Sequence, residues 1–196
     1  MKKALFLVMI LALSVFTTAC INNLAVQELN NKAAEYMKKG DYENAISRLK
    51  SSVDLDSSIF ETQYNLAVAY TENEDYEEAK EAFEKALELK PNSKDVYYSM
   101  AVMYENYAKD LYAGNTKAQK EQADSDDEGN KVNFNTDGKY KPSESEIESV
   151  KKYYNNSIDA YAKYLELAPN AEDSLDVKAH IEQLQANLET LDVDTN

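Results

Sequence analysis

The sequence predicts an all-α fold in which pairs of helices stack into a solenoid. Only 4 glycines and 3 prolines occur among 196 residues, which disfavours a turn-rich β fold. A helix–turn–helix pattern recurs with a period of about 34 residues. An amphipathic stretch over residues 172–191 provides a closing helix. We expect about three repeats and a C-terminal capping helix, with the third repeat interrupted by a long, partly disordered acidic insertion.

The overall charge restricts the classes of partner. The formal net charge is −15, and such a surface repels the phosphate backbone of nucleic acids. It equally disfavours docking on anionic lipid through a basic patch. The one cysteine, Cys20, cannot form a disulfide within the chain. We therefore expect neither nucleic-acid binding nor a disulfide framework.

The first segment has the features of an export signal. Lys2 and Lys3 precede a predominantly apolar run from Ala4 to Phe16. This run is too short to span a hydrocarbon layer of roughly 30 Å, but it has the length of a signal-peptide core. We therefore expect residues 1–19 to be a signal peptide.

The residues Thr-Thr-Ala-Cys that follow resemble the cleavage site of a bacterial lipoprotein, although Thr17 stands where that family prefers Leu. The resemblance implies cleavage after Ala19, lipid on Cys20 and a tether over residues 20–25. In a host with two membranes, Ile21 implies sorting to the periplasmic side of the outer membrane. The alternative is an ordinary secretory signal cut after Ala19, with Cys20 unmodified.

The helical repeats follow the signal. The same residue types recur at corresponding places of a first unit (26–59) and a second (60–93): Tyr36 and Tyr70, Asp41 and Asp75, Tyr42 and Tyr76, Ala45 and Ala79, Leu49 and Phe83. Small side chains at these places let two antiparallel helices approach closely, and Pro91 stops the second helix. Charged residues then occupy the exposed faces.

Residues 60–93 closely resemble a tetratricopeptide repeat. The family's consensus places carry Leu66, Ala67, Tyr70, Ala79, Phe83, Ala86 and Pro91. The first unit is a weaker match, because Lys32 and Ser57 stand where Leu and Pro are usual. The resemblance implies that the first helix of each repeat, helix A, lines a concave binding groove.

The third unit, residues 94–171, is interrupted. The interval from Tyr104 to Ser157 is several times longer than the interval between the matching residues of the second unit, Tyr70 and Ala79. We place the insertion at about 111–150 and expect helix over 105 to about 122 and again over 144–153, which lengthens both helices of the repeat. The tip between them is acidic and polar, and its alternation around Gly138 allows a small hairpin.

The capping helix is predicted over residues 172–191, followed by a tail at 192–196. The apolar residues expected on one side of this helix are Leu175, Ile181, Leu184, Leu188 and Leu191.

The acidic tip offers an alternative function. Asp124, Asp126, Glu128 and Gly129 occupy the first places of an EF-hand calcium loop, but Asn135 stands where the bidentate Glu is needed. A calcium- or cation-responsive element built on the insertion is therefore the alternative to protein binding, and a solvated acidic loop is the simpler interpretation.

Catalysis is not expected. Cys20 would carry lipid, His180 is the only imidazole, and neither a His/Cys zinc cluster nor a glycine-rich phosphate loop occurs. We expect no cofactor, no bound metal and no small-molecule substrate.

With catalysis not expected, the function that remains is binding of a partner in the groove lined by the A helices. The residues that the resemblance places there are Asn30, Glu61, Tyr64, Asn65, Val68, Asp95, Tyr98 and Val102. Tyrosines are frequent binding hot spots, and the two carboxylates favour a basic or N-terminal peptide group. The alternative for Tyr64 and Tyr98 is packing between repeats.

Co-chaperone members of the family grip a C-terminal carboxylate with Lys, Asn and Arg. Of the matching places here, Asn30, Ala34, Asn65, Asp95 and Ser99, only Asn65 fits, so such a clamp is not expected. The sequence as a whole predicts a membrane-anchored protein-interaction scaffold of the bacterial cell envelope, whose partner is another protein or peptide.

Overall fold

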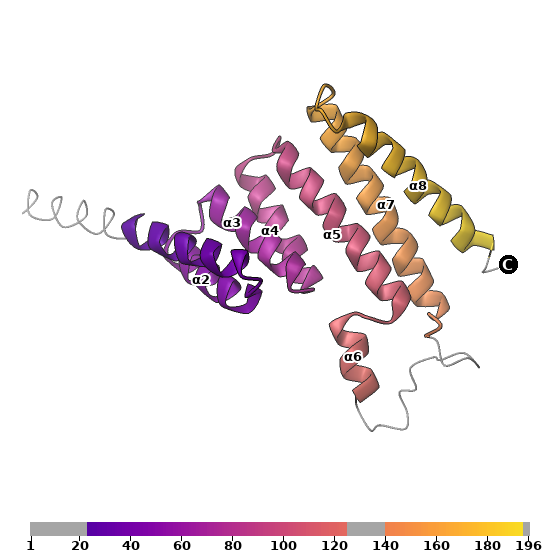
Figure 1. The fold of residues 1–196 in the computed structure, drawn as a ribbon, viewed down its shortest axis with the longest axis horizontal. Helices are drawn as coiled ribbons and strands as arrows, with labels where there is room; N and C mark the ends of the chain where they lie inside the picture. Colours follow the sequence, from indigo (N-terminus) through magenta and orange to yellow (C-terminus); the bar gives the residue numbers. More distant parts are fainter. Residues whose placement is uncertain (1–22, 125–139, 194–196) are drawn as a thin grey trace, which may run out of the picture.

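The computed structural model describes residues 23–124 and 140–193. Within these two ranges the chain forms helices and no β-strand, and the helices lie side by side in one extended array (Figure 1). This arrangement confirms the predicted all-α solenoid. The predicted tip of the insertion and its hairpin lie outside the described residues.

Two compact repeats open the array. Residues 23–38 are helical and precede α2 (Tyr42–Leu55), and the second repeat consists of α3 (Phe60–Glu72) and α4 (Tyr76–Leu89). The third repeat pairs α5 (Lys94–Ala113) with α7 (Glu144–Leu167). Between them lies α6 (Lys117–Asp124), and α8 (Ser174–Val193) closes the array.

The predicted small positions lie in the core. Ala45, Ala79 and Ser157 have no exposed surface, and the bulky Leu49 and Phe83 are equally buried beside them. The small side chains let the helices approach closely, and the bulky ones fill the remaining space, as expected for a densely packed interior. Ser157 also donates a hydrogen bond from its Oγ to the Ala101 carbonyl at 2.9 Å, which joins α7 to α5.

The long helices of the third repeat are held together by stacked tyrosines. The Tyr107 ring stacks on Tyr76 of α4, with centroids 4.8 Å apart, and on Tyr153 of α7 at 4.2 Å. Helices α5 and α7 have 20 and 24 residues, against 14 in α4, as the lengthening of this repeat predicted. The tyrosine stack therefore links the second repeat to the extended third one.

The helix expected from 105 to about 122 is broken, and this part of the prediction is wrong. Gly114 adopts a left-handed φ of 73° and ends α5, and the Asn115 N–H donates to the Asp110 carbonyl at 2.8 Å. The Tyr140 ring lies so close that a Cβ on Gly114 would be 2.5 Å from it. The chain restarts at Lys117 as α6, which projects from the lower end of the array in Figure 1.

The closing helix packs on α7 through all but one of the residues predicted for its packed side, and Val177 joins them. Val177, Leu184 and Leu191 are buried at heptad spacing, and Ile181 and Leu188 are half-buried beside the core. Leu175 is 75% exposed, so its predicted place on the packed side is wrong. Leu175 precedes Val177 by two residues, and a step of two residues along an α-helix leads to nearly the opposite face.

Candidate peptide-binding face

The eight residues predicted to line a groove lie on three helices: the first helix (23–38), α3 and α5. We call this set, Asn30, Glu61, Tyr64, Asn65, Val68, Asp95, Tyr98 and Val102, the A-helix face. The structure gives its members three different roles, which are structural bridges, half-buried packing residues and exposed groups.

Asn30 is a structural bridge. Its Nδ2 donates to Thr62 Oγ1 at 2.9 Å and to Ser52 Oγ at 3.2 Å, and its Oδ1 accepts from the Thr62 hydroxyl at 3.2 Å. Thr62 and Ser52 have no exposed surface, so buried polar groups depend on this amide. Asn30 therefore joins the first helix to α2 and α3, a structural role that the sequence did not predict.

Tyr64 packs between repeats. Its ring stacks on Phe60 with centroids 6.1 Å apart and tilts against Phe83 at 6.3 Å, and its hydroxyl lies 3.0 Å from Ser99 Oγ. The ring thus connects α3, α4 and α5. Packing, the alternative left open by the sequence, describes this residue.

Tyr98 both packs and faces solvent. The ring meets Tyr161 and Tyr164 of α7 edge-on, with centroids 5.6 and 5.2 Å apart. Its exposed fraction is nevertheless 38%, which makes it one of the more exposed large hydrophobic residues of the described chain. Tyr98 is therefore anchored by α7 and still presents part of an aromatic surface, which is the arrangement typical of binding anchors.

Two exposed carboxylates stand at equivalent places. Glu61 and Asp95 lie in the first turns of α3 and α5, and neither makes an ion pair within the described ranges. The charge of Asp95 acts on its neighbours. A hydrogen bond to Asp173 at 2.5 Å, burial and the charges of Asp173 and Asp95 raise the pKa of the Tyr164 hydroxyl to about 12. The potential at this end of α5 is therefore negative.

Asn65, Val68 and Val102 occupy the middle of the same face and are half-buried. Both valines contact the core, whereas the Asn65 amide makes no hydrogen bond with any described residue. Of these three, Asn65 is the one with free hydrogen-bonding capacity.

The structure adds a polar bridge that sequence reasoning missed. Glu105 of α5 accepts from Lys109 Nζ at 2.6 Å and from His180 Nε2 of α8 at 2.7 Å. The Glu105 side chain is only 7% exposed, and burial raises the pKa of its carboxyl. The hydrogen bonds and charges of Lys109 and His180 outweigh burial, so that this pKa lies below its ordinary value of 4.5. His180 therefore fixes α8 to α5, and no sequence pattern linked two residues so far apart in the chain.

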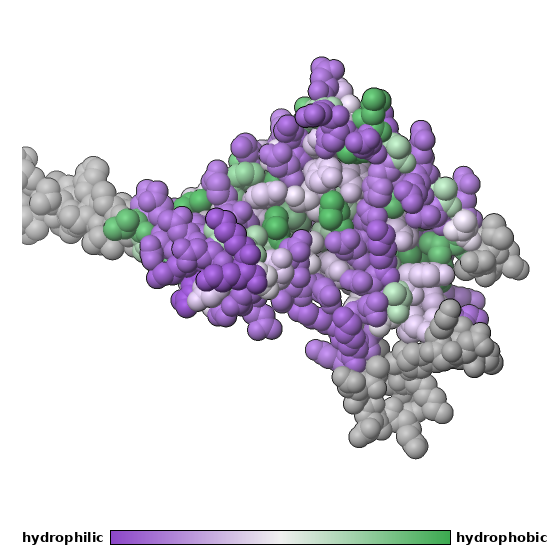
Figure 2. Space-filling model, viewed as in Figure 1, coloured by the Kyte–Doolittle hydropathy of each residue, from purple (hydrophilic) through white to green (hydrophobic). Residues whose placement is uncertain are grey.

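Surface hollows lie away from the A-helix face. One of about 260 Å³ is lined by residues of α2, α3 and α4, among them Lys50, Tyr70, Glu81 and Lys85. Lysine and acidic side chains both line it, and within the described ranges no three His, Cys, Asp or Glu side chains gather as a metal site. On the side that Figure 2 shows, the surface of the described residues is mostly hydrophilic, with smaller apolar areas between.

Some of the predicted lipid- and cation-binding residues are not among the described side chains. Cys20, Asp126 and Glu128 lie outside the described residues, and of Asp124, which ends α6, only the backbone is described. No helix in the described part of the chain has both the length and the apolar character needed to cross a bilayer.

Comparison with known families and structures agrees with this architecture. Models of the tetratricopeptide repeat match residues 60–93 and residues 29–59. The chain contains tetratricopeptide repeats. These two matches end at residue 93, and the helices of the interrupted third repeat follow. No curated protein sequence matches the chain.

Solved tetratricopeptide structures resemble the whole array. The first tetratricopeptide domain of Spaghetti (RPAP3), bound to the HSP90 peptide SRMEEVD, has a TM-score of 0.52 and 17% identity, and the match covers 83% of this chain and 94% of that one. The first such domain of human RPAP3 has a TM-score of 0.53 and 18% identity, with 84% and 95% covered. At these identities the likeness concerns the fold.

Proposed function

We propose that the tetratricopeptide array is a protein-interaction module that binds a basic segment of a partner protein along its A-helix face. One observation carries this proposal. Glu61 and Asp95 repeat at equivalent places of neighbouring helices, exposed and without cationic partners in the described ranges, and the exposed part of Tyr98 lies one turn beyond Asp95. Carboxylates beside an aromatic surface suit Lys and Arg side chains, through charge and through cation–π contact.

An acidic C-terminal peptide does not suit the same face. The RPAP3 domain of similar fold holds the peptide SRMEEVD. At the places where co-chaperones carry carboxylate-binding residues, this chain has Asp95, and Asn30 and Ser99 are engaged in internal hydrogen bonds. A carboxylate would meet like charge here, so the proposed ligand has the opposite charge.

Peptide selection tests this proposal. A random peptide library is selected on the full chain, and binding of the enriched peptides is then measured by titration. We expect enrichment of Lys and Arg, and a loss of about tenfold in affinity for Glu61→Gln/Asp95→Asn, which corresponds to about 1.4 kcal/mol. The control variant, Glu43→Gln/Glu84→Gln, removes the same charge from exposed positions of α2 and α4. Enrichment of acidic peptides, or equal losses in both variants, would contradict the proposal.

We further propose that the module is a lipid-anchored scaffold of the bacterial cell envelope. The support is the sequence of residues 1–20, in which two lysines, a short apolar run and a small residue precede Cys20. Two or three acyl chains would anchor the chain firmly, whereas one alone is marginal. Metabolic labelling with an alkyne fatty acid should label the wild type and not Cys20→Ala, which should leave the membrane fraction. An unlabelled wild type that keeps a free thiol would overturn this anchoring.

A further inference from the structure

The turns of the first two repeats have the same backbone. Gly40 and Glu74, at equivalent places of their repeats, have φ values of 72° and 61°. The N–H of each donates to the carbonyl of the third residue before it, at 3.0 and 3.1 Å. The next residues, Asp41 and Asp75, donate to the Tyr36 and Tyr70 carbonyls at 3.0 and 2.9 Å. One turn geometry is therefore built once with glycine and once with glutamate.

Glycine is the residue that this geometry favours. A left-handed φ brings Cβ close to the following carbonyl, so residues with a side chain adopt it at a cost. Glu74 is the one non-glycine residue with positive φ in the described ranges. Backbone strain of this kind points to a role for the side chain that occupies the position.

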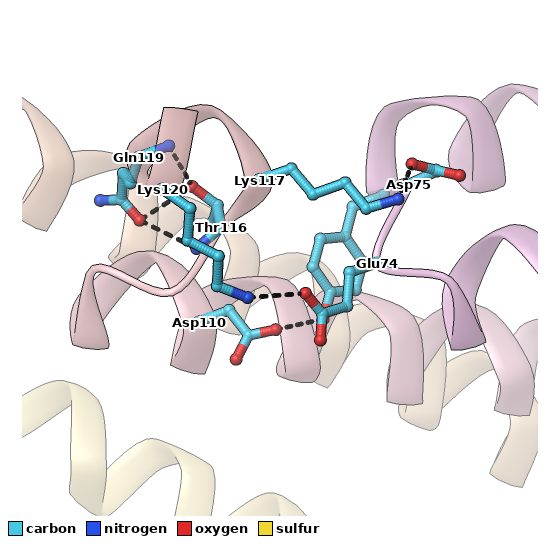
Figure 3. A network of polar contacts seen from close by, with 8 residues as sticks. Glu74, Asp75, Asp110, Thr116, Lys117, Gln119 and Lys120 are labelled. Carbon is cyan, nitrogen blue, oxygen red and sulfur yellow. Dashed lines mark hydrogen bonds and ion pairs between the residues drawn. The ribbon is translucent and has the colours of Figure 1, made fainter. Parts of the chain in front are cut away.

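The Glu74 side chain meets the insertion. Lys120 Nζ lies 3.0 Å from Glu74 Oε2, and Lys117 Nζ lies 2.5 Å from Asp75 Oδ1, so two lysines one turn apart on α6 contact two successive carboxylates (Figure 3). In the first repeat Gly40 has no such side chain. The turn that departs from glycine is thus the one against which α6 lies.

The base of α6 is held separately by the hydrogen bonds of Gln119. This side chain, 7% exposed, accepts from the Thr116 hydroxyl at 2.8 Å and donates to the Leu111 carbonyl at 3.1 Å and to Tyr140 Oη and Glu146 Oε1, both at 2.7 Å. These bonds attach α6 to α5 and to the start of α7. They do not attach it to the second repeat, which α6 reaches through Lys117 and Lys120.

We propose that the turn around Glu74 and Asp75 is a docking site for α6, and that Glu74 is kept in a strained backbone because it holds α6 there by charge. Helix α6 is then a strap, tied to the third repeat by Gln119 and to the second by two ion pairs. While docked, it covers the carboxylates of this turn and fixes the point from which the insertion leaves the array.

The contact is built to be reversible. The paired side chains are between 23% and 51% exposed, and no apolar side chain described on α6 is buried against the turn. Exposed ion pairs are individually weak, and salt screens charges beyond about 8 Å at physiological ionic strength. We therefore expect salt, or a competing basic segment, to release α6 from the turn around Glu74 and Asp75.

Amide hydrogen exchange with mass spectrometry, together with thermal melting of the full chain, tests the proposal. Glu74→Gly relieves the backbone and removes the ion pair. The two readouts should therefore move in opposite directions: Tm should rise by about 2 °C, while exchange over residues 117–121 becomes about two- to fivefold faster. Glu74→Gln keeps the strained backbone, so exchange should accelerate without a rise in Tm.

The control is Glu88→Gln, which removes the exposed Lys85–Glu88 pair of α4 and should change neither readout at α6. In the wild type, about 0.5 M salt should reproduce the faster exchange. Unchanged exchange over 117–121 in both Glu74 variants would show that charge does not dock α6. A Tm that falls in Glu74→Gly would show that the glutamate backbone carries no strain. Either result overturns the proposal.

Discussion

At the scale of single residues, the junction between α5 and α8 depends on one buried carboxylate. Glu105 has two hydrogen-bond donors, Lys109 and His180, and both favour its ionised form. The folded state therefore binds the Glu105 proton less readily than the unfolded chain does. The stability that this residue contributes is present above pH 4.5 and is lost as the pH falls through the lower pKa of the folded state.

Replacement of Glu105 by Gln isolates this contribution. At pH 7 we expect Glu105→Gln to lower the free energy of unfolding by about 1–3 kcal/mol, because charge-assisted hydrogen bonds are replaced by weaker ones. Between pH 5 and pH 3 the variant should lose less stability than the wild type, so that the two curves converge. Urea denaturation followed by circular dichroism measures both. Parallel curves over this range would mean that Glu105 titrates with the same pKa in both states.

At the scale of elements, the start of the insertion is fixed by a glycine and a distant tyrosine. Gly114 ends α5 with a left-handed φ, and the Tyr140 ring covers it from the other end of the insertion. Helix α7 then begins with a capping box, in which Ser143 Oγ accepts from the Glu146 N–H at 3.3 Å and Glu146 Oε2 accepts from the Ser143 N–H at 2.8 Å. Both ends of the insertion are thereby anchored at one place.

Gly40 and Gly114 have nearly equal φ but different surroundings, so substitutions at the two positions distinguish backbone strain from steric crowding. Gly40 has a φ of 72° and nothing within 4 Å of an added Cβ, so Gly40→Ala should cost about 1 kcal/mol through its backbone alone. Gly114→Ala should cost a further 1–3 kcal/mol, roughly, because Cβ would displace the Tyr140 ring. Exchange should accelerate over residues 114–121 in that variant only. Equal costs in the two variants would show that the ring moves freely.

These elements also show how much of the fold could be predicted from the sequence. The repeats were predictable because small residues such as Ala45 and Ala79 must recur wherever helices approach closely, and α7 was predictable from its apolar spacing. The break at Gly114 was not, because an isolated glycine is compatible with a helix until a partner such as Tyr140 is known to pack on it. The structural roles of Asn30 and His180 could not be predicted for the same reason: they depend on hydrogen-bond partners 22 to 75 residues away.

At the scale of the whole molecule, the array combines a small-residue core with an acidic exterior. The chain has a net charge of −15. Several of its lysines pair with nearby glutamates, as in α4 and α7. Among the exposed carboxylates without an ion pair in the described ranges, Glu61 and Asp95 stand at equivalent places of successive A helices. Long-range attraction of a basic partner, and its weakening by salt, follow from this distribution.

The central claim is that the repeats, and not the insertion, bind the partner. The most direct measurement is crosslinking and capture from intact cells with three forms of the full-length chain. These are the wild type, Glu61→Gln/Asp95→Asn, and a variant in which a Gly-Ser linker replaces residues 115–139. We predict that the carboxylate variant loses the partners that the linker variant keeps. If the linker variant loses them and the carboxylate variant keeps them, the repeats are a support for the insertion and the claim is wrong.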